Sequence, residues 1–491
     1  MAILSDLLYK TSIQAVIGLT NIEVSHITAD SRKAGPGMVF VAVTGTQVDG
    51  HAFIQQAIQQ GVVAVVCESL PINGEDADIT FVQVKDSAEA LGILASNFYG
   101  NPSSKLNLVG ITGTNGKTTI ATLLYQLFKA LGYRTGLIST VKYHVHEEEI
   151  ESTHTTPDPM KLNELLAAMV RAKCTHAFME VSSHAVVQRR IAGLQFTGGV
   201  FSNITHDHLD FHKTFDNYIA AKKRFFDDLS PTAFVLANAD DKRGQVMMQN
   251  TRAAKHYFSL RHHQDFSAKI ISNSIHGLEL EVLGHQTWFK LIGEFNASNL
   301  LAVIATAKLL HEDDQEILIH LSTLNGVAGR FERVESADGV TAIVDYAHTP
   351  DALQNVLQTL NKILGGKDNI ITLVGCGGNR DKEKRPVMAE IAVKNSGKTI
   401  FTSDNPRNEK PEDIIDDMMN DLGATMKRRV VRIENREEAI KQACAMARPG
   451  DVILIAGKGH ENYQEIAGVK HPFNDKELVI KYLNLNPKPQ K

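Results

Sequence analysis

Cysteine is scarce in this sequence, and its four copies lie far apart in the chain. Cys67, Cys174, Cys376 and Cys444 form no C-x-x-C pair, and no histidine stands beside them at the spacing of a metal site. A zinc site or a redox motif would need such closely spaced residues. The pattern therefore argues against both and indicates reduced, mostly buried thiols.

Long apolar runs are also missing. No stretch approaches the roughly 18 apolar residues that a membrane-spanning helix needs. The first ten residues lack the basic segment and the long apolar core of a secretory signal. We therefore expect a cytoplasmic protein with no membrane span.

The chain has no large excess of charge of one sign. Its formal net charge is -5, spread over many residues of both signs, so the overall field gives no reason to expect nucleic acid or an anionic membrane as a partner. Short basic runs at 382–385 and 427–429 are typical of solvated faces. Any anionic ligand must be held by a local site.

The length of 491 residues is too great for a single hydrophobic core and predicts a multidomain protein. Strand-like runs alternate with helical stretches, which is the pattern of α/β domains with parallel sheets. A turn-rich connector at 100–104 gives the first boundary, and a further series of alternating elements begins near residue 340. We predict a small N-terminal α/β domain at 1–104, a central domain at 105–333 and a C-terminal Rossmann-like domain at 334–491.

The strongest local motif, GITGTNGKTT, begins at Gly110 and lies between a strand at 108–112 and a helix at 120–131. In this order, backbone N–H groups and the positive helix end can surround phosphate oxygens, while Lys117 reaches the outer phosphates. Thr118 can then offer its hydroxyl to Mg2+. The spacing departs from the usual pattern, because Ile111 stands at the first glycine position. A simple turn is the alternative, but it does not explain GKTT at this junction.

TGTNGKTT, with motifs spread over nearly the whole chain, resembles the Mur ligase family, whose members build the peptide stem of the peptidoglycan precursor. The resemblance implies a central parallel-sheet ATPase domain, and an ATP-dependent ligase that activates a carboxylate as an acyl phosphate and joins it to an amine. It implies ATP contacts from Gly113, Thr114, Asn115, Gly116, Lys117, Thr118, Thr119, Asn296, Arg330 and His348. Helix capping is the alternative role for Asn296.

Glu180 ends an apolar strand at 177–181, and His208 follows the next strand. Both fall at the carboxyl edge of a parallel sheet, where ligands of such sheets bind. A helix-capping glutamate and a structural histidine are the alternatives. The resemblance implies that Glu180 and His208 hold Mg2+, and that Lys222 carries a carbamate, an oxygen ligand suited to a hard metal. These residues and Lys117 are the predicted catalytic groups, with Thr118 as a further metal ligand.

The acceptor that the resemblance implies is a UDP-N-acetylmuramoyl dipeptide. Polar turns in the N-terminal domain resemble family segments that hold its uridine part, although such turns are commonly only solvated connections. Segments of the central domain resemble those that hold the muramoyl peptide. The implied contacts are Ala29, Ser31, Thr46, Gln47 and Val48 for the first part, and Thr155, Thr156, Ser182, Gln188 and Arg190 for the second.

The amino-acid donor is indicated by a DNPR segment at 404–407, which follows a strand at 398–402. An arginine fork pairs with a carboxylate, and meso-diaminopimelate has a distal carboxylate where lysine has only an ammonium group that Arg407 would repel. The resemblance places Arg380, Asp404, Asn405, Pro406, Arg407, Gly457 and Glu461 around this donor. Glycines at 375, 377 and 378 could suggest a dinucleotide loop, but the third glycine of that motif is missing.

The sequence thus predicts a ligase that adds meso-diaminopimelate to the D-glutamate of the UDP-N-acetylmuramoyl dipeptide in cytoplasmic peptidoglycan precursor synthesis, with ATP and Mg2+ as cofactors. We expect it to be a monomer. Three alternatives remain: an L-lysine-adding ligase of the same family, a folylpolyglutamate-synthetase-like ligase, and a nucleotide-dependent switch without ligase activity. A switch would need neither a second metal nor an amine site.

Overall fold

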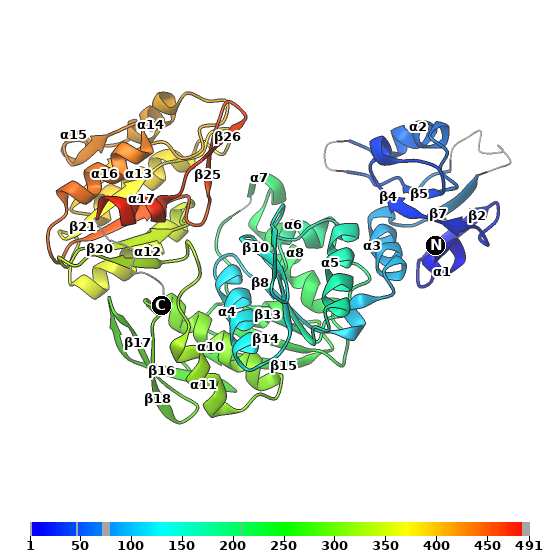
Figure 1. The fold of residues 1–491 in the computed structure, drawn as a ribbon, viewed down its shortest axis with the longest axis horizontal. Helices are drawn as coiled ribbons and strands as arrows, with labels where there is room; N and C mark the ends of the chain where they lie inside the picture. The colour runs from blue at the N-terminus through cyan, green and yellow to red at the C-terminus, as the bar shows by residue number, and fades with distance from the viewer. Residues whose placement is uncertain (1, 46–47, 71–78, 208, 484–491) are drawn as a thin grey trace.

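The computed structural model describes residues 2–45, 48–70, 79–207 and 209–483. These residues form three large sheets, and each sheet takes its strands from a separate part of the chain. Figure 1 shows three lobes, with the N-terminal lobe (blue) and the C-terminal lobe (yellow to red) on opposite sides of the central one. The predicted three-domain α/β architecture is confirmed.

The N-terminal sheet has the strand order β2-β7-β6-β5-β4, with parallel pairs except for β2 against β7. Its strands are β2 (Ile13–Ile17), β4 (His26–Thr28), β5 (Met38–Val41), β6 (Ala64–Cys67) and β7 (Thr80–Val84). A short pair, β1 (Ala2–Ile3) with β3 (Glu23–Val24), lies apart from it. The α-helices of this lobe are α1 (Leu4–Leu7), α2 (Ile54–Gln59) and α3 (Ser87–Phe98).

The central sheet has the order β11-β10-β9-β12-β8-β13-β14-β15-β16-β17-β18. Its strands are β8 (Asn107–Thr112), β9 (Thr135–Ile138), β10 (Lys142–Val145), β11 (Glu148–Glu151), β12 (His176–Glu180), β13 (Gly198–Phe201), β14 (Phe234–Asn238), β15 (Ala254–Ser259), β16 (Phe266–Ser274), β17 (Gly277–Val282) and β18 (His285–Phe289). Its α-helices are α4 (Lys117–Ala130), α5 (Pro159–Arg171), α6 (Ser183–Val187), α7 (Leu209–His212), α8 (Phe215–Asp227), α9 (Gly244–Met247), α10 (Glu294–Leu309) and α11 (Asp314–Thr323).

The part of this sheet from β9 to β16 is parallel, as the sequence predicts. Antiparallel strands extend it at both edges, β10 and β11 on one side and β17 and β18 on the other. The sequence analysis does not predict these edges. Strand β11 reads Glu-Glu-Ile-Glu and is mostly exposed, so it lacks the apolar run that marks a buried parallel strand.

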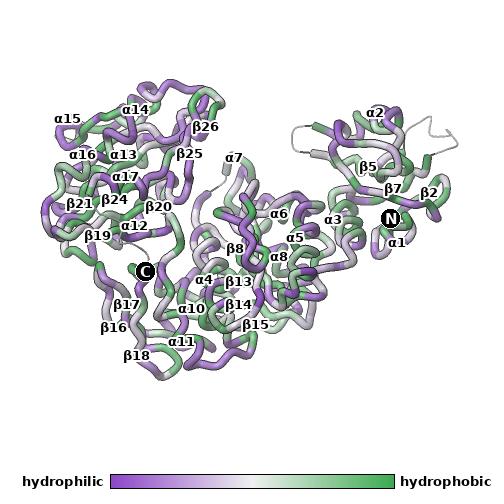
Figure 2. The backbone as a smooth tube through the Cα atoms, in the orientation of Figure 1, coloured by the Kyte–Doolittle hydropathy of each residue, from purple (hydrophilic) through white to green (hydrophobic). Residues whose placement is uncertain are grey.

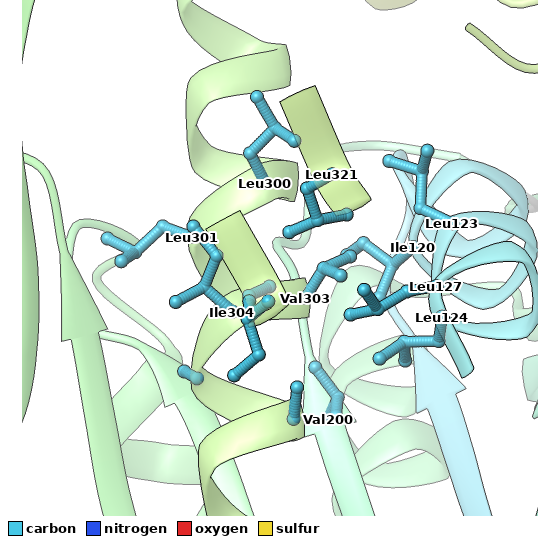
Figure 3. Packing of buried hydrophobic residues seen from close by; sticks show 14 of the residues in the cluster. Ile120, Leu123, Leu124, Leu127, Val200, Leu300, Leu301, Val303, Ile304 and Leu321 are labelled. Carbon is cyan, nitrogen blue, oxygen red and sulfur yellow. The ribbon is translucent and has the colours of Figure 1, made fainter. Parts of the chain in front are cut away.

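Two helices form the hydrophobic core behind the phosphate motif. In Figure 3, side chains of α4, such as Leu123 and Leu127, face those of α10, such as Leu300 and Val303, with Leu321 of α11 beside them. Helix α10 is buried along most of its length, as expected for a helix that is apolar on all sides. The packing fixes the start of α4 against the sheet.

The C-terminal sheet has the order β19-β20-β24-β21-β22-β23 and is parallel except for β19 against β20. Its strands are β19 (Glu332–Glu335), β20 (Thr341–Asp345), β21 (Ile370–Val374), β22 (Lys398–Phe401), β23 (Val430–Arg432) and β24 (Val452–Ala456), followed by the hairpin β25 (Tyr463–Ile466) and β26 (Val469–Pro472). Its α-helices are α12 (Pro350–Leu364), α13 (Lys384–Asn395), α14 (Pro411–Met419), α15 (Ala424–Lys427), α16 (Arg436–Met446) and α17 (Asp475–Tyr482).

Hydropathy varies over short distances along the backbone. Figure 2 shows hydrophobic and hydrophilic residues interspersed in all three lobes. Within the described part of the chain, no helix has both the length and the apolar character needed to span a bilayer.

The lobes are joined by polar contacts. Asp351, in the first turn of α12, accepts hydrogen bonds through its Oδ2 atom from Asn115 Nδ2 (3.0 Å) and from Thr205 Oγ1 (2.9 Å) of the central lobe. At the other end, Arg189 Nε of the central lobe donates to Asp86 Oδ2 of the N-terminal lobe at 3.1 Å. The C-terminal lobe therefore touches the phosphate motif directly.

His176 should make stability depend on pH. Its side chain is buried at the start of β12, and burial lowers its pKa from 6.5 to about 4. In the unfolded chain His176 becomes protonated below about pH 6.5, whereas in the folded chain it becomes protonated only below about pH 4. Acidification through this window should cost on the order of 3 kcal/mol of unfolding free energy. Denaturant unfolding at pH 7 and pH 4.5 should show the loss in the native protein and a smaller loss in His176→Phe; equal losses would contradict the assignment.

Asp351→Ala should loosen the contact between the C-terminal and central lobes, because it removes the acceptor of two interdomain hydrogen bonds. Hydrogen bonds to a charged group contribute about 1.5–3 kcal/mol each. Amide hydrogen exchange at residues 113–117 should accelerate in this variant. The exposed Asp413 of the same lobe supplies the matched control, Asp413→Ala, and equal exchange in both variants would refute the role of Asp351.

Candidate active site

The phosphate motif has the strand, loop and helix order that the sequence predicts: β8 ends at Thr112 and α4 begins at Lys117. Gly113 and Gly116 have φ angles of +152° and +88°. A Cβ atom on Gly113 would lie 2.0 Å from Ser202 Oγ, and one on Gly116 would lie 2.5 Å from Asn299 Oδ1. The loop therefore requires glycine at both positions.

Two lysines meet at one backbone carbonyl of this loop. Lys117 Nζ donates to the carbonyl oxygens of Gly113 and Thr114, both at 2.9 Å. Lys222 Nζ, on α8, donates to the same Gly113 oxygen at 2.8 Å. Strand, loop and a distant helix thus bring two ammonium groups together at the carboxyl edge of the sheet.

Burial controls the charge of these lysines. Desolvation lowers the pKa of Lys117, and the carboxylates of Glu180 and Asp207 oppose that shift. Lys222 is 1% exposed, and its pKa is well below its usual value because of burial and the nearby Lys117 ammonium. Burial therefore shifts Lys222 toward the neutral amine, which is the form that reacts with electrophiles.

Glu180 provides a carboxylate beside the loop. It is fully buried at the end of β12, and its Oε1 atom accepts a hydrogen bond from the Thr140 backbone N–H at 2.7 Å. Its Oε2 atom is buried and has no hydrogen-bond partner among the described residues. A buried carboxylate oxygen normally has a partner, so this atom fits a site for a hard cation such as Mg2+. The helix-capping alternative for Glu180 is not observed.

His208 lies outside the described residues. Within the described part of the chain, no group of three or more His, Cys, Asp or Glu side chains could hold a metal ion. Glu180 and Thr118, whose side chain is buried at the start of α4, are two of the oxygen donors near the loop. A metal site here would need further oxygen ligands, which a carbamate on Lys222 could supply.

Arg330 reaches the phosphate loop from the connection into the C-terminal lobe. Its Nη2 atom donates to Thr118 Oγ1 at 3.2 Å, and its guanidinium group lies 4.6 Å from the centre of the Tyr346 ring. His348, which follows Tyr346 by two residues, is exposed, and its Nδ1 atom lies 2.8 Å from the Tyr346 carbonyl oxygen. The structure therefore brings Arg330 to the loop and leaves His348 at its rim.

Asn296 and Asn299 lie inside α10 and do not cap it, because the N-cap is Gly293. Asn296 Nδ2 donates to the Ile292 carbonyl oxygen at 2.8 Å, and Asn299 Nδ2 donates to Asn296 Oδ1 at 3.1 Å. Asn299 in turn lies against Gly116 of the phosphate loop. The capping alternative for Asn296 is therefore wrong, and the two amides support the loop.

The predicted muramoyl-peptide residues form one hydrogen-bonded group next to Glu180. Thr156 Oγ1 donates to the Glu180 carbonyl oxygen at 2.8 Å and accepts from the Ser182 N–H at 3.1 Å. Arg190 donates to the Thr156 carbonyl oxygen at 2.6 Å and to Gln188 Oε1 at 2.9 Å. Thr155 joins through Thr140, with 3.0 Å between their hydroxyl oxygens. Residues spread over 35 positions of sequence are thus brought together.

The predicted uridine contacts belong to the N-terminal lobe, away from the phosphate loop (Figure 1). Ala29 and Ser31 follow β4, and Ser31 Oγ donates to Gln56 Oε1 at 3.3 Å. Val48 is 57% exposed, which leaves an apolar side chain free to cover a ring. Thr46 and Gln47 lie outside the described residues.

The predicted donor residues gather at the carboxyl ends of β22 and β24. Asn405 Nδ2 donates to Glu461 Oε2 at 2.8 Å, and a Cβ atom on Gly457 would lie 2.6 Å from Asp404 Oδ2. Arg407 Nη1 donates to the Gly378 carbonyl oxygen at 2.9 Å. Pro406 connects Asn405 to Arg407 within the same loop.

Arg380 lies near Arg407. A Cβ atom on Gly377 would lie 3.0 Å from Arg407 Nη1 and 3.6 Å from Arg380 Cγ. Arg380 is exposed and Arg407 is half-buried. Two arginines beside one glycine suit a ligand with a carboxylate.

Sequence analysis missed two buried cations in this region. Lys458 is fully buried between Gly457 and Glu461, which are themselves predicted contacts. Arg385 is fully buried and pairs with Glu409 at 3.0 Å and with Asp417 at 2.8 Å, so its assignment to a solvated basic face is wrong. Hydrogen bonds from Arg385 hold the pKa of Glu409 at about 2. In the sequence, the only signal for these buried cations is that each lies close to a predicted donor-binding segment.

Comparisons with known proteins agree with this geometry. Models described as "Mur ligase family, catalytic domain", "Mur ligase middle domain" and "Mur ligase, glutamate ligase domain" match residues 23–99, 111–307 and 329–459. A UDP-N-acetylmuramoyl-L-alanyl-D-glutamate–2,6-diaminopimelate ligase of Cytophaga hutchinsonii is 60% identical over 98% of each chain. Another protein of that name, from Listeria monocytogenes, is 42% identical over 93% of each chain.

Solved structures give the same result. A structure of a UDP-N-acetylmuramoyl-L-alanyl-D-glutamate–2,6-diaminopimelate ligase superposes with a TM-score of 0.70 at 30% identity, over 98% of this chain and 99% of the other. A folylpolyglutamate synthase of Thermotoga maritima shares the fold alone, with a TM-score of 0.58 at 17% identity over 75% of this chain and 90% of the other. With family models along most of its length and similar proteins along nearly all of it, the chain belongs to the Mur ligase family.

Proposed function

We propose that this protein is an ATP-dependent ligase that adds meso-2,6-diaminopimelate to the D-glutamate of UDP-N-acetylmuramoyl-L-alanyl-D-glutamate in peptidoglycan synthesis. The relatives described above carry this activity in their names. The observation that carries the proposal is the cluster of Lys117, Lys222, Glu180 and Arg330 around the phosphate loop. Such a cluster suits the transfer of a phosphoryl group, because the transferred group develops negative charge that cations must neutralise.

The reaction begins with attack of the γ-carboxylate of D-glutamate on the γ-phosphorus of ATP. The bond to the bridging oxygen breaks, ADP leaves, and an acyl phosphate forms. Lys117 would leave the Gly113 and Thr114 carbonyl oxygens for the phosphate oxygens, and Arg330 would stabilise charge beside Thr118. The free amine of the donor then attacks the acyl carbon, phosphate departs, and the amine loses a proton to give the amide.

Thr118, Glu180 and a carbamate on Lys222 would hold Mg2+, with His208 as a further ligand. The buried, unpaired Oε2 atom of Glu180 supports this set, and the lowered pKa of Lys222 supports carbamate formation, because only a neutral amine adds carbon dioxide. The metal would screen the repulsion between the triphosphate and the acceptor carboxylate. The Gly113 to Thr119 loop, Asn296, Arg330 and His348 would hold ATP.

The acceptor would extend from the N-terminal lobe to Glu180. Ala29, Ser31, Thr46, Gln47 and Val48 would hold its uridine part, and Thr155, Thr156, Ser182, Gln188 and Arg190 would hold its peptide. With the substrates on separate domains, we infer that closure about hinges near residues 104 and 334 excludes water from the acyl phosphate. We further infer a cytoplasmic monomer.

Arg407 would select the donor, because its guanidinium group pairs with the distal carboxylate of meso-diaminopimelate. L-lysine lacks that carboxylate and would bring an ammonium group to a cationic site. A folylpolyglutamate-synthetase-like activity is disfavoured, since that structural neighbour covers only 75% of this chain. A switch without ligase activity would not need a donor site.

Lys117→Ala should abolish most of the turnover. Removal of one group that stabilises transition-state charge costs about a hundred- to a thousandfold in rate. Phosphate release with ATP, the UDP-N-acetylmuramoyl dipeptide and meso-diaminopimelate measures this effect. Lys129→Ala, at the exposed end of the same helix, is the control and should retain activity. Full activity of Lys117→Ala would overturn the proposed role of the loop.

Arg407→Met should raise the KM for meso-diaminopimelate by about 10- to 100-fold, because a charge-assisted hydrogen-bond pair to a carboxylate is lost. The preference of the variant for meso-diaminopimelate over L-lysine should fall, while its KM for ATP should stay within about twofold of the native value. Arg428→Met, an exposed arginine of the same lobe, is the control. If the native protein turned over L-lysine but not meso-diaminopimelate, the donor assignment would be refuted.

A further inference from the structure

Lys458 is a buried cation whose role is not explained by the phosphate loop or by the predicted contacts. We propose that Lys458 is a positioning residue for the amino-acid donor, which fixes the side chains of Asn405 and Glu461 in the orientation that receives it. The inference rests on the proposed function, because it assumes that this loop pair binds the donor.

The geometry of Lys458 joins the two loops of the donor site. Its Nζ atom donates to Asn405 Oδ1 at 3.0 Å, in the loop after β22, and to Glu461 Oε2 at 2.9 Å, in the loop after β24. Strand β21 lies between β22 and β24 in the sheet. Lys458 therefore adds its hydrogen bonds to the direct Asn405–Glu461 contact between two loops whose strands are not neighbours in the sheet.

Lys458 is one of the groups that determine which way the Asn405 amide faces. An ammonium group has only hydrogen-bond donors, so it must face the amide oxygen. The Glu465 N–H also donates to that oxygen, at 2.9 Å. The amide nitrogen is thereby directed to Glu461 Oε2, at 2.8 Å. If Lys458 were removed, a flipped amide would turn its oxygen toward the carboxylate and lose this arrangement.

The position of the Glu461 carboxylate matters for binding the amino group of the donor. The hydrogen bonds from Lys458 and Asn405 both use its Oε2 atom. Its side chain keeps 18% of its surface exposed while Lys458 is fully buried. The carboxylate is therefore anchored through one oxygen, and its other oxygen is the group that we expect to accept an ammonium group of the donor.

An aromatic ring lies beside Lys458. Its ammonium group lies 5.5 Å from the centre of the Tyr463 ring, at the start of the β25–β26 hairpin. Lys470 of the same hairpin lies over the same ring at 4.1 Å but is exposed. Two lysines thus lie over one aromatic ring, and Lys458 is the one that donates hydrogen bonds to the donor loops. Lys470 can therefore serve as its control.

The test compares Lys458→Met with Lys470→Met in the full-length protein. With saturating ATP and acceptor, we expect Lys458→Met to raise the KM for meso-diaminopimelate about tenfold or more, with the KM for ATP within about twofold of the native value. Lys470→Met should leave both constants unchanged. An unchanged donor KM in folded Lys458→Met would overturn the inference.

Loss of a buried charge partner can also prevent folding, so Lys458→Gln serves as a second variant. Its amide N–H can still donate to Asn405 Oδ1, and we expect a smaller rise in donor KM than for methionine, of about threefold or more. If Lys458→Met does not fold, a donor KM of Lys458→Gln equal to the native value overturns the inference. Failure of the native protein to turn over meso-diaminopimelate would instead refute the proposed function, which keeps the two outcomes distinct.

Discussion

The candidate site depends on the close approach of other elements to the Gly113 carbonyl and the loop that contains it. Two lysines from different helices donate to that one oxygen, and the glycines leave no room for side chains against Ser202 and Asn299. Like charges this close would repel strongly unless burial lowered their pKa values and carboxylates lay nearby. Both conditions are met, by burial and by Glu180 and Asp207.

The C-terminal lobe completes this site from outside the central sheet. Arg330 and Asp351 reach Thr118, Asn115 and Thr205, so the orientation of that lobe is coupled to the phosphate loop. The donor loops belong to the same lobe. If the donor binds there as proposed, a change in the orientation of this lobe would move the donor relative to the phosphate loop.

Much of the site could be predicted from local sequence. The order of strand, glycine loop and helix was sufficient to identify Lys117 and Thr118, since phosphate loops depend on contiguous backbone. The resemblance supplied Glu180, Arg190 and Asn405, whose neighbours in space are far away in sequence. The binding and catalytic roles of these residues, the domain boundaries and the set of metal ligands stay predictions. The antiparallel edges of the central sheet escaped prediction, and the outermost strand β11 is polar and mostly exposed.

The sequence by itself determined the α/β class and the order of strand, glycine loop and helix around Lys117, because each rests on residues that are close together in the chain. Only the tertiary structure decided which charges are buried and what they contact. Arg385 stands in a basic run that suggests a solvated face, yet it is buried against Glu409 and Asp417. Lys458 likewise gains its partner Asn405 across 53 residues, because the parallel strands β22 and β24 end at the same edge of the C-terminal sheet.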